Sequence, residues 1–206
     1  MKTKIIIILG ALLIMVCLIL IAGHIYYLNL LKTYTAAHPM DIVPPRPTHQ
    51  SMEETEKQIT EIARGLDKGE EQTVIISSSQ IPALVELIPQ LKDVKNQCTI
   101  TIEDGLLVIT ASLPLPLGEP PRYLNGTFKV DVLMNTPGEL EAKIVSGITE
   151  EGGPLPHHLL SLANTLLIPR LLDEPKVKEQ TSKIQSISVK GDKLTATLSP
   201  EAKKGM

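Results

Sequence analysis

Two adjacent histidines, His157 and His158, are the side chains of this sequence that most suggest a metal site. Neighbouring side chains on a helix diverge by about 100°. No carboxylate stands three or four positions from either histidine, so the pair cannot easily grip one ion. We expect one histidine to be solvated and the other to lie against a sheet, with no metal site.

Three close pairs of carboxylates could support acid–base catalysis only if burial separated their pKa values. Their contexts predict a hairpin turn, the outer face of a strand and a loop, which are all solvated places. The pairs are Glu103 with Asp104, Glu139 with Glu141, and Glu150 with Glu151. The sequence also contains no phosphate-binding loop, dinucleotide fingerprint, nucleophile elbow or zinc-protease motif. We therefore predict a protein that is not an enzyme and that uses no cofactor.

A single cysteine and a possible glycosylation motif give little further indication of function. Cys98 is the only cysteine besides Cys17, so it is expected to be a small core residue rather than half of a disulfide within the domain. Asn125-Gly126-Thr127 matches the acceptor pattern for N-glycosylation, which matters only in a host that glycosylates exported proteins.

Charge and aromatic content argue against a nucleic-acid partner. Residues 50–206 hold 22 acidic and 16 basic residues, a formal net charge of −6, and their aromatic residues are Tyr123 and Phe128. Binding to a nucleic acid needs a basic footprint or a stacking platform, and neither is present.

A membrane partner is indicated by the N-terminus. Ile5–Leu31 contains 27 residues without Asp, Glu, Lys or Arg, and about 20 helical residues cross a hydrocarbon core. We predict an uncleaved single-pass anchor over residues 1–32. Lys2, Lys4 and the free amine precede the span, which favours a cytoplasmic N-terminus and an extracytoplasmic domain at the cell membrane.

The rest of the chain divides into a spacer and one domain. Residues 33–50 include Pro-Pro-Arg-Pro at 44–47, which is typical of a semi-rigid, Pro-rich linker. Residues 51–206 are enough for one domain with its own core. We expect a first helix over 51–66 with Ser51 as its N-cap.

Alternating apolar residues and turn signals predict the strands. Asp104-Gly105 is a hairpin turn that pairs Ile102 with Leu107, and Gly191-Asp192 turns the last hairpin. Between these hairpins, strands over 127–134 and 139–144 continue an antiparallel meander with one apolar face. Thr73–Ile76 reads as a further short strand. The fold class is therefore α+β, with an antiparallel sheet of about six strands covered by two main helices.

Two helices are expected to cover that sheet. The first follows Ser79, its expected cap, has Pro82 in its first turn, and should bend or end at Pro89. The second is the leucine-rich segment Pro154–Glu174, which Pro169 should kink. It has too many leucines for one narrow stripe, so it is either sandwiched between layers or lines a cavity. The residues expected to line such an apolar pocket are Phe128, Val130, Val132, Leu159, Leu162 and Leu166.

The order of these motifs resembles a known family. A hairpin with Ile-Glu-Asp-Gly-Leu-Leu runs into Leu-Pro-Leu-Pro-Leu-Gly over 102–118, and a Phe-x-Val-x-Val strand starts at Phe128. Gly-Gly-x-Leu-Pro at 152–156 then precedes the leucine-rich helix. This pattern is similar to the YpmS-like family of small bacterial membrane-anchored proteins, which implies an anchored domain without catalytic residues. The layout also resembles half of a tubular lipid-binding domain, a likeness of fold alone.

Two functions follow from these expectations. The first is a non-catalytic, single-pass envelope protein whose exported domain serves as an interaction or scaffolding module for a protein partner. The alternative is a domain that binds or carries a lipid or another hydrophobic ligand between helix 155–172 and the sheet. A packed core would favour the first function, and a continuous apolar cavity would favour the second.

Overall fold

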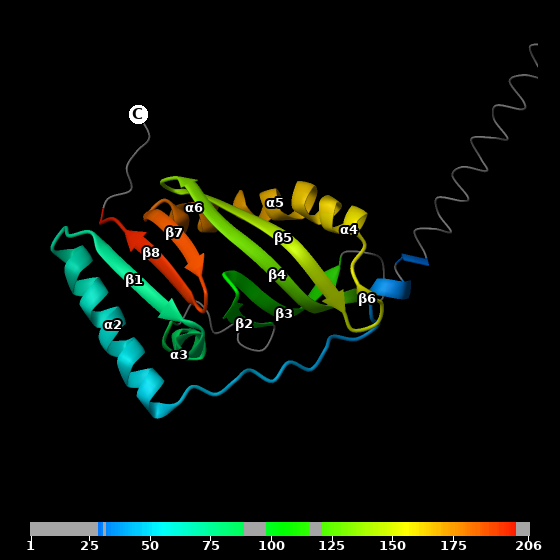
Figure 1. Cartoon of the computed structure of the whole chain (residues 1–206), viewed down its shortest axis with the longest axis horizontal. Helices are drawn as coiled ribbons and strands as arrows, with labels where there is room; N and C mark the ends of the chain where they lie inside the picture. The colour runs from blue at the N-terminus through cyan, green and yellow to red at the C-terminus, as the bar shows by residue number, and fades with distance from the viewer. Residues whose placement is uncertain (1–28, 31, 89–97, 116–120, 201–206) are drawn as a thin grey trace, which may run out of the picture.

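The chain folds into two antiparallel sheets and a small number of helices, as a computed structural model shows for residues 29–30, 32–88, 98–115 and 121–200 (Figure 1). This confirms the α+β class. The elements are α2 (His49–Asp67), β1 (Gln72–Ser77), η1 (Ser78–Gln80), α3 (Ile81–Leu87), β2 (Cys98–Glu103), β3 (Leu106–Leu115), β4 (Arg122–Thr136), β5 (Glu139–Thr149), β6 (Gly153–Pro154), α4 (His157–Leu162), η3 (Ala163–Leu167), α5 (Ile168–Leu172), α6 (Pro175–Thr181), β7 (Ile184–Lys190) and β8 (Lys193–Leu198).

The larger sheet is the predicted meander, with strand order β2-β3-β4-β5-β6. Ile102 pairs with Leu107, and Asp104 and Gly105 have φ of 51° and 79°. The predicted register is therefore confirmed, because a primed turn requires positive φ at both positions. A bulge between Lys129 and Val130 shifts the pairing of β4 with β5.

The smaller sheet has the order β1-β8-β7, and Val189 pairs with Leu194 as predicted. The expectation of one sheet of about six strands is wrong. The first strand, β1, pairs with β8 near the other end of the domain and does not extend the meander. Strand periodicity shows which side chains share a face, but it does not show which distant strands pair.

The core lies on the apolar face of the meander. Phe128, Val130 and Val132 are 5%, 7% and 7% exposed, and they form its buried cluster. Ile187 of β7 packs against this cluster, and β7 lies in contact with β4. The two sheets therefore share one hydrophobic core, although no backbone ladder joins them.

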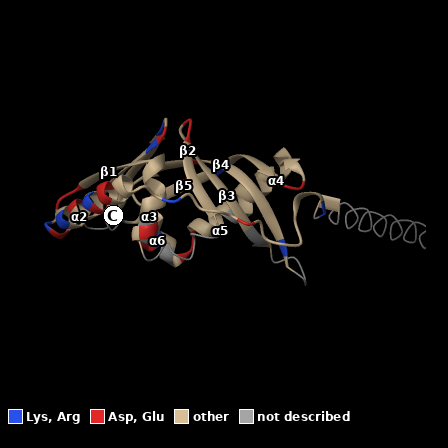
Figure 2. Cartoon of the chain, turned by 90° about the horizontal axis from the view of Figure 1, so that it is seen from below, with Lys and Arg blue, Asp and Glu red and all other residues tan. Residues whose placement is uncertain are grey.

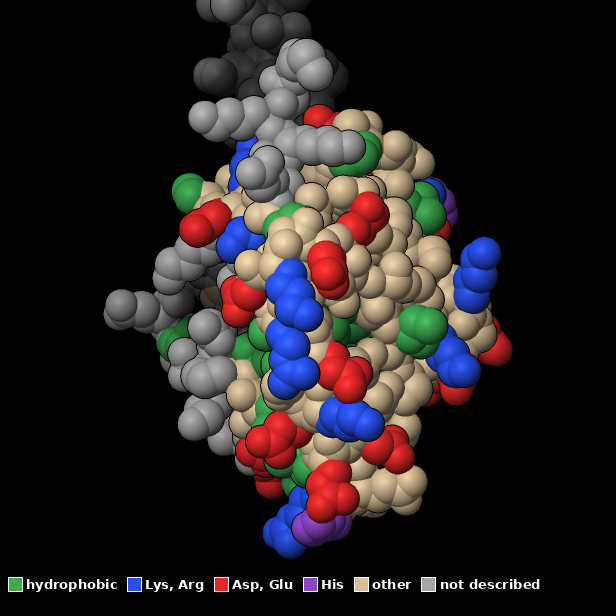
Figure 3. All heavy atoms as spheres, turned by 90° about the vertical axis from the view of Figure 1, so that its left-hand side faces the viewer, with side chains coloured by type: hydrophobic (Ala, Val, Ile, Leu, Met, Phe, Trp, Pro, Cys, Tyr) green, Lys and Arg blue, Asp and Glu red, His purple; other side chains and the backbone are tan. Residues whose placement is uncertain are grey.

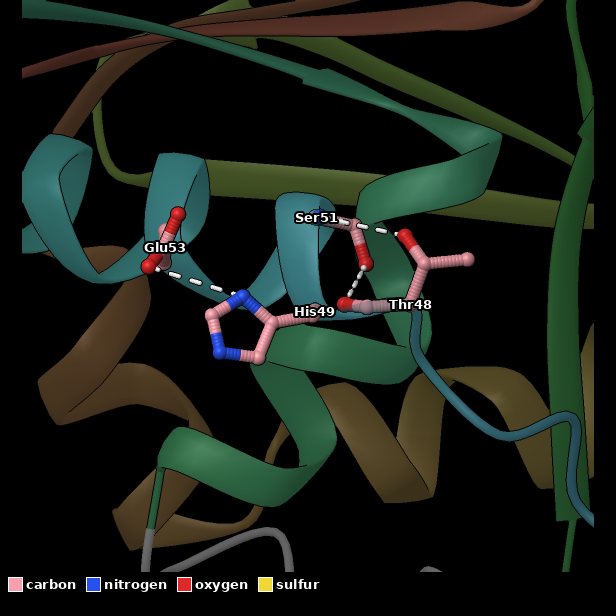
Figure 4. A network of polar contacts seen from close by, with 4 residues as sticks. All are labelled: Thr48, His49, Ser51 and Glu53. Atoms are coloured by element: carbon pink, nitrogen blue, oxygen red, sulfur yellow. Dashed lines mark hydrogen bonds and ion pairs between the residues drawn. The ribbon is translucent and has the colours of Figure 1, made fainter.

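Helix α2 begins earlier than the sequence indicates. Thr48, not Ser51, is the N-cap: its hydroxyl oxygen accepts from the Ser51 amide at 3.1 Å, and the Ser51 hydroxyl donates to the Thr48 carbonyl at 3.0 Å (Figure 4). Both threonine and serine are good caps, and only the backbone geometry decides between them. In the same turn His49 contacts Glu53 at 3.5 Å in a solvated pair.

The start of α3 differs in a similar way. Pro82 lies in the first turn as predicted, but Gln80 rather than Ser79 is the N-cap of α3. Ser77 is the N-cap of the preceding η1, in a capping box with Gln80. The box satisfies the first free amides reciprocally.

Helix α2 lies beside β1, the edge strand of the smaller sheet, and the Gln58 side chain donates to the Ile75 carbonyl at 2.9 Å (Figure 1). An amide side chain thus occupies part of a strand edge that would otherwise be open to pairing with another chain.

Thr55, on the buried face of α2, gives a stability prediction. Its side chain is 1% exposed, and its hydroxyl has no hydrogen-bond partner in the part of the chain that the structure describes. Replacing it with the isosteric Val should raise the free energy of unfolding by about 1 kcal/mol, since an unpaired buried hydroxyl is removed. Chemical denaturation measures this change. Thr60→Val, at an exposed position of the same helix, is the matched control, and a loss of stability in Thr55→Val would contradict the prediction.

The segment predicted as a spacer lies on the domain. Ala36 and Tyr123 exchange backbone hydrogen bonds at 2.8 and 2.9 Å, and Thr35 and Ile42 are buried. The chain then runs along the domain to α2 (Figure 1). We call residues 35–48 the strap. It is part of the folded unit, so the domain starts well before residue 51.

Several predictions concern residues outside the described ranges. These are most of the span over residues 5–31, the bend or end of the helix at Pro89, and the last three residues of the Leu-Pro-Leu-Pro-Leu-Gly pattern. Within the described ranges, no helix has the length and hydropathy to cross a bilayer.

Candidate functional site

The six residues predicted to line an apolar pocket separate into two groups. Phe128, Val130 and Val132 belong to the close-packed core, where their neighbours include Leu107, Ile109, Ile144 and Leu155. Leu159 is partly buried, but Leu162 and Leu166 are 55% and 58% exposed. The three strand residues therefore lie in the core, whereas Leu162 and Leu166 face solvent.

The leucine-rich helix starts at His157 rather than near Pro154, and it changes pitch at η3, where the Ile168 amide donates to the Ala163 carbonyl. This bond spans five residues and marks a π-helical turn. Pro169 follows directly and has no amide hydrogen for the carbonyl four residues before it. The change of helix type thus lies directly before Pro169, and the kink predicted there stays a prediction.

Asn164, in that turn, fixes the helix to the edge of the larger sheet. Its Oδ1 accepts from the Ile144 amide at 2.7 Å, and its Nδ2 donates to the Ile144 carbonyl at 2.9 Å. The carboxamide therefore pairs with β5 as a neighbouring strand would. As a result the helix runs along the edge of β5 (Figure 1), not across the apolar face as the sequence suggested.

This placement leaves an apolar surface in solvent. Leu162, Leu166 and Leu171 are each more than half exposed. We call these three residues the leucine face. The sequence from Gly152 to Leu172 contains no Asp or Glu, and its only Lys or Arg is Arg170. Figure 2 shows charged residues concentrated at the opposite end of the domain, around α2 and β1.

That opposite end has a different character. Figure 3 views it directly and shows acidic and basic side chains intermixed over the surface. Neither sign forms a patch large enough to favour a polyanion or a polycation. Helix α2 contributes exposed residues of both signs, including Glu61 and Arg64.

Two hollows lie elsewhere. A groove of about 470 Å³ runs between the β4–β5 turn and helices α5 and α6, and it is lined by Gly138, Glu139, Leu140, Leu172, Asp173, Val177, Lys178 and Thr181. Its lining is mixed, and Lys178 pairs with Asp173 across 2.9 Å in solvent. The second hollow, about 30 Å³ beside Pro44 and Cys98, has room for little more than a water molecule.

The groups singled out for chemistry stay apart in the fold. His157 and His158 are both exposed at the start of α4, and the three carboxylate pairs are exposed as well. Among the described residues, no three His, Cys, Asp or Glu side chains are grouped so that they could hold a metal ion. Burial raises the pKa of the Cys98 thiol, which makes it a weaker nucleophile at neutral pH.

Asn125 has a structural role that the sequence did not indicate. Its side chain is 2% exposed; Oδ1 accepts from the Ser112 hydroxyl at 2.7 Å and from the Met40 amide at 3.2 Å, and Nδ2 donates to the His38 carbonyl at 3.1 Å. The glycosylation motif predicts an accessible side-chain nitrogen at Asn125, but in the folded domain this nitrogen donates a hydrogen bond to the His38 carbonyl. Two of these partners, Met40 and His38, belong to the strap and are far from Asn125 in the sequence.

Arg122 holds the start of the strap in the same region. Its guanidinium donates to both the hydroxyl and the carbonyl oxygen of Thr35. The beginning of β4 thus fixes the chain at the point where it leaves the predicted anchor.

Comparison with protein-family models, with curated proteins and with solved structures gave no match. The resemblance to the YpmS-like family stays a prediction.

Proposed function

We propose that this chain is a non-catalytic, single-pass membrane protein whose extracytoplasmic domain acts as an interaction or scaffolding module through its surface. The observation that carries the proposal is the separation of the predicted pocket into a packed core and an exposed leucine face. Solvent-exposed apolar side chains are typical of a surface that binds another molecule, whereas a lipid carrier has its apolar side chains lining an internal pocket around the ligand.

The packing of the core supports this choice over the carrier. The buried cluster Phe128, Val130 and Val132 contacts side chains of both sheets and of the segment before α4, including Leu155 and Ile187. A lipid chain would have to displace these contacts. The 470 Å³ groove beside α6 is too polar along its lining to substitute for such a site.

The distribution of ionisable groups supports the absence of catalysis. The carboxylate pairs and the two histidines are exposed. General acid–base catalysis by a pair of such groups requires environments that separate their pKa values, and burial is the usual cause of that separation. The only cysteine of the domain has a raised pKa, opposite to what an activated nucleophile requires.

Native mass spectrometry of the domain tests this function. A protease site inserted before Lys32 of the full chain releases a domain that has already folded and keeps its strap. We expect the bare mass of the domain or of a defined oligomer. A lipid retained in a fixed ratio would contradict the proposal and put the carrier function first.

A further inference from the structure

The strap limits how far the domain can move from the predicted anchor. Thr35 is buried in the domain and Ala36 is bonded to Tyr123, while the apolar run ends at Leu31. The intervening residues 32–34 are helical. Four helical steps span about 6 Å, and even a fully extended chain spans no more than about 14 Å. The part of the domain next to Thr35 must therefore lie at the surface of the bilayer.

The leucine-rich helix starts at that same part of the domain. A Cβ on Gly152 would clash with the Thr33 carbonyl oxygen and with the ring of Tyr34, so the chain from the anchor packs directly on the turn before α4. Figures 1 and 2 agree that α4 lies beside the first described residues, and that α2 and β1 lie at the far end.

The chemistry of the helix suits a bilayer surface. Its exposed side chains include Leu162, Leu166 and Leu171. Acidic residues stop at Glu151 and resume at Asp173, so no carboxylate from the helix itself would meet the lipid headgroups. A domain with a formal charge of −6 thus presents a neutral to basic helix where the tether holds it nearest to the membrane.

We propose that the leucine face of α4, η3 and α5 rests in the interface of the bilayer that holds the anchor. The partner of this surface is then the lipid bilayer itself. The domain is then held at the membrane at two places, Thr35 at the start of the strap and the leucine face. Its charged end, around α2, points away from the bilayer. This inference rests on the proposed function, whose interaction surface it assigns.

Tryptophan fluorescence of the full chain in vesicles tests the contact. The sequence contains no tryptophan, so Leu166→Trp introduces a single reporter on the leucine face. Ile75→Trp is the matched control, because Ile75 is also an exposed apolar residue and lies on β1 at the far end. Each variant is reconstituted in vesicles of phosphatidylcholine with or without bromine on the upper acyl carbons.

We expect bromine to lower the emission of Leu166→Trp about twofold and to leave that of Ile75→Trp unchanged, since interfacial helices bury their apolar face about 5–10 Å deep. Equal quenching of both variants, or none in either, would overturn the proposal. A blue-shifted Leu166→Trp emission that bromine does not quench would also overturn it, because a protein surface would then cover the leucines. None of these results depends on whether the released domain carries a lipid, so the two proposals fail separately.

Discussion

Replacing Val130 by Glu is expected to unfold the domain, whereas replacing Leu166 by Glu is expected to leave it folded. Val130 is 7% exposed and lies between Leu107 of β3 and Ile144 of β5. A carboxylate there would be buried among apolar side chains without a partner. Such a change costs more than about 4 kcal/mol, which is a large part of the stability of a typical domain.

Leu166 provides the matched control for the same chemical change. It is 58% exposed, so a carboxylate at this position stays in water, and the effect on stability should be within about 0.5 kcal/mol. Circular dichroism and resistance to thermolysin distinguish the two outcomes in the detergent-solubilised chain. A folded Val130→Glu variant would contradict the packing of the core, and an unfolded Leu166→Glu variant would contradict the exposure of the leucine face.

The Leu166→Glu variant is also useful in the membrane. It places a charge on the leucine face of a domain that is still folded, so any loss of membrane contact can be assigned to the surface and not to unfolding.

Replacing Asn125 by Ala is expected to release the strap from the domain. The change removes the donor to the His38 carbonyl and leaves the Ser112 hydroxyl without its 2.7 Å acceptor. It also removes one of the two acceptors of the Met40 amide, which keeps the Ser112 hydroxyl oxygen at 3.3 Å. Each unpaired buried group costs about 1–3 kcal/mol, and relaxation of the strap into water recovers part of this. We expect a net loss of about 2–4 kcal/mol.

Limited proteolysis locates this effect. Thermolysin cleaves before large apolar residues, and Ile42 in the strap is buried in the folded domain. If the substitution lowers the free energy of opening the strap by about 2 kcal/mol, the population of the open form rises roughly 30-fold. The rate of cleavage before Ile42 should rise by the same factor when opening and closing are fast relative to cleavage. Asn135→Ala is the control, because Asn135 is exposed and bonds only to Glu141 at 3.1 Å among the contacts known for it. An unchanged rate in Asn125→Ala would show that other contacts hold the strap.

Asn125 also shows how a motif and a fold can disagree. The sequence pattern predicts an acceptor that a glycosylating enzyme could reach, but the folded chain uses both atoms of the carboxamide internally. A glycan at this nitrogen would require the strap to be displaced. The residue is therefore better understood as the group that holds the strap than as a modification site.

Local sequence patterns were sufficient to predict how neighbouring strands pair in the two hairpins. The Asp104-Gly105 and Gly191-Asp192 turns predicted the registers of their hairpins, and the alternation around Phe128 predicted which side chains of that strand share a face. These features are local, because a two-residue turn and a period of two fix which side chains share a face. The same locality explains why Pro82 was placed correctly in the first turn of its helix.

The arrangement of these elements relative to one another depends on long-range contacts, which local patterns do not predict. The pairing of β1 with β8, the strap on Asn125 and the Asn164 carboxamide on the edge of β5 all join residues that are far apart in the sequence. The leucine-rich segment has apolar residues on too many sides for periodicity to indicate which of them are buried. The two hydrogen bonds between Asn164 and Ile144 hold the helix at the edge of the sheet. In this position Leu162 and Leu166 face solvent.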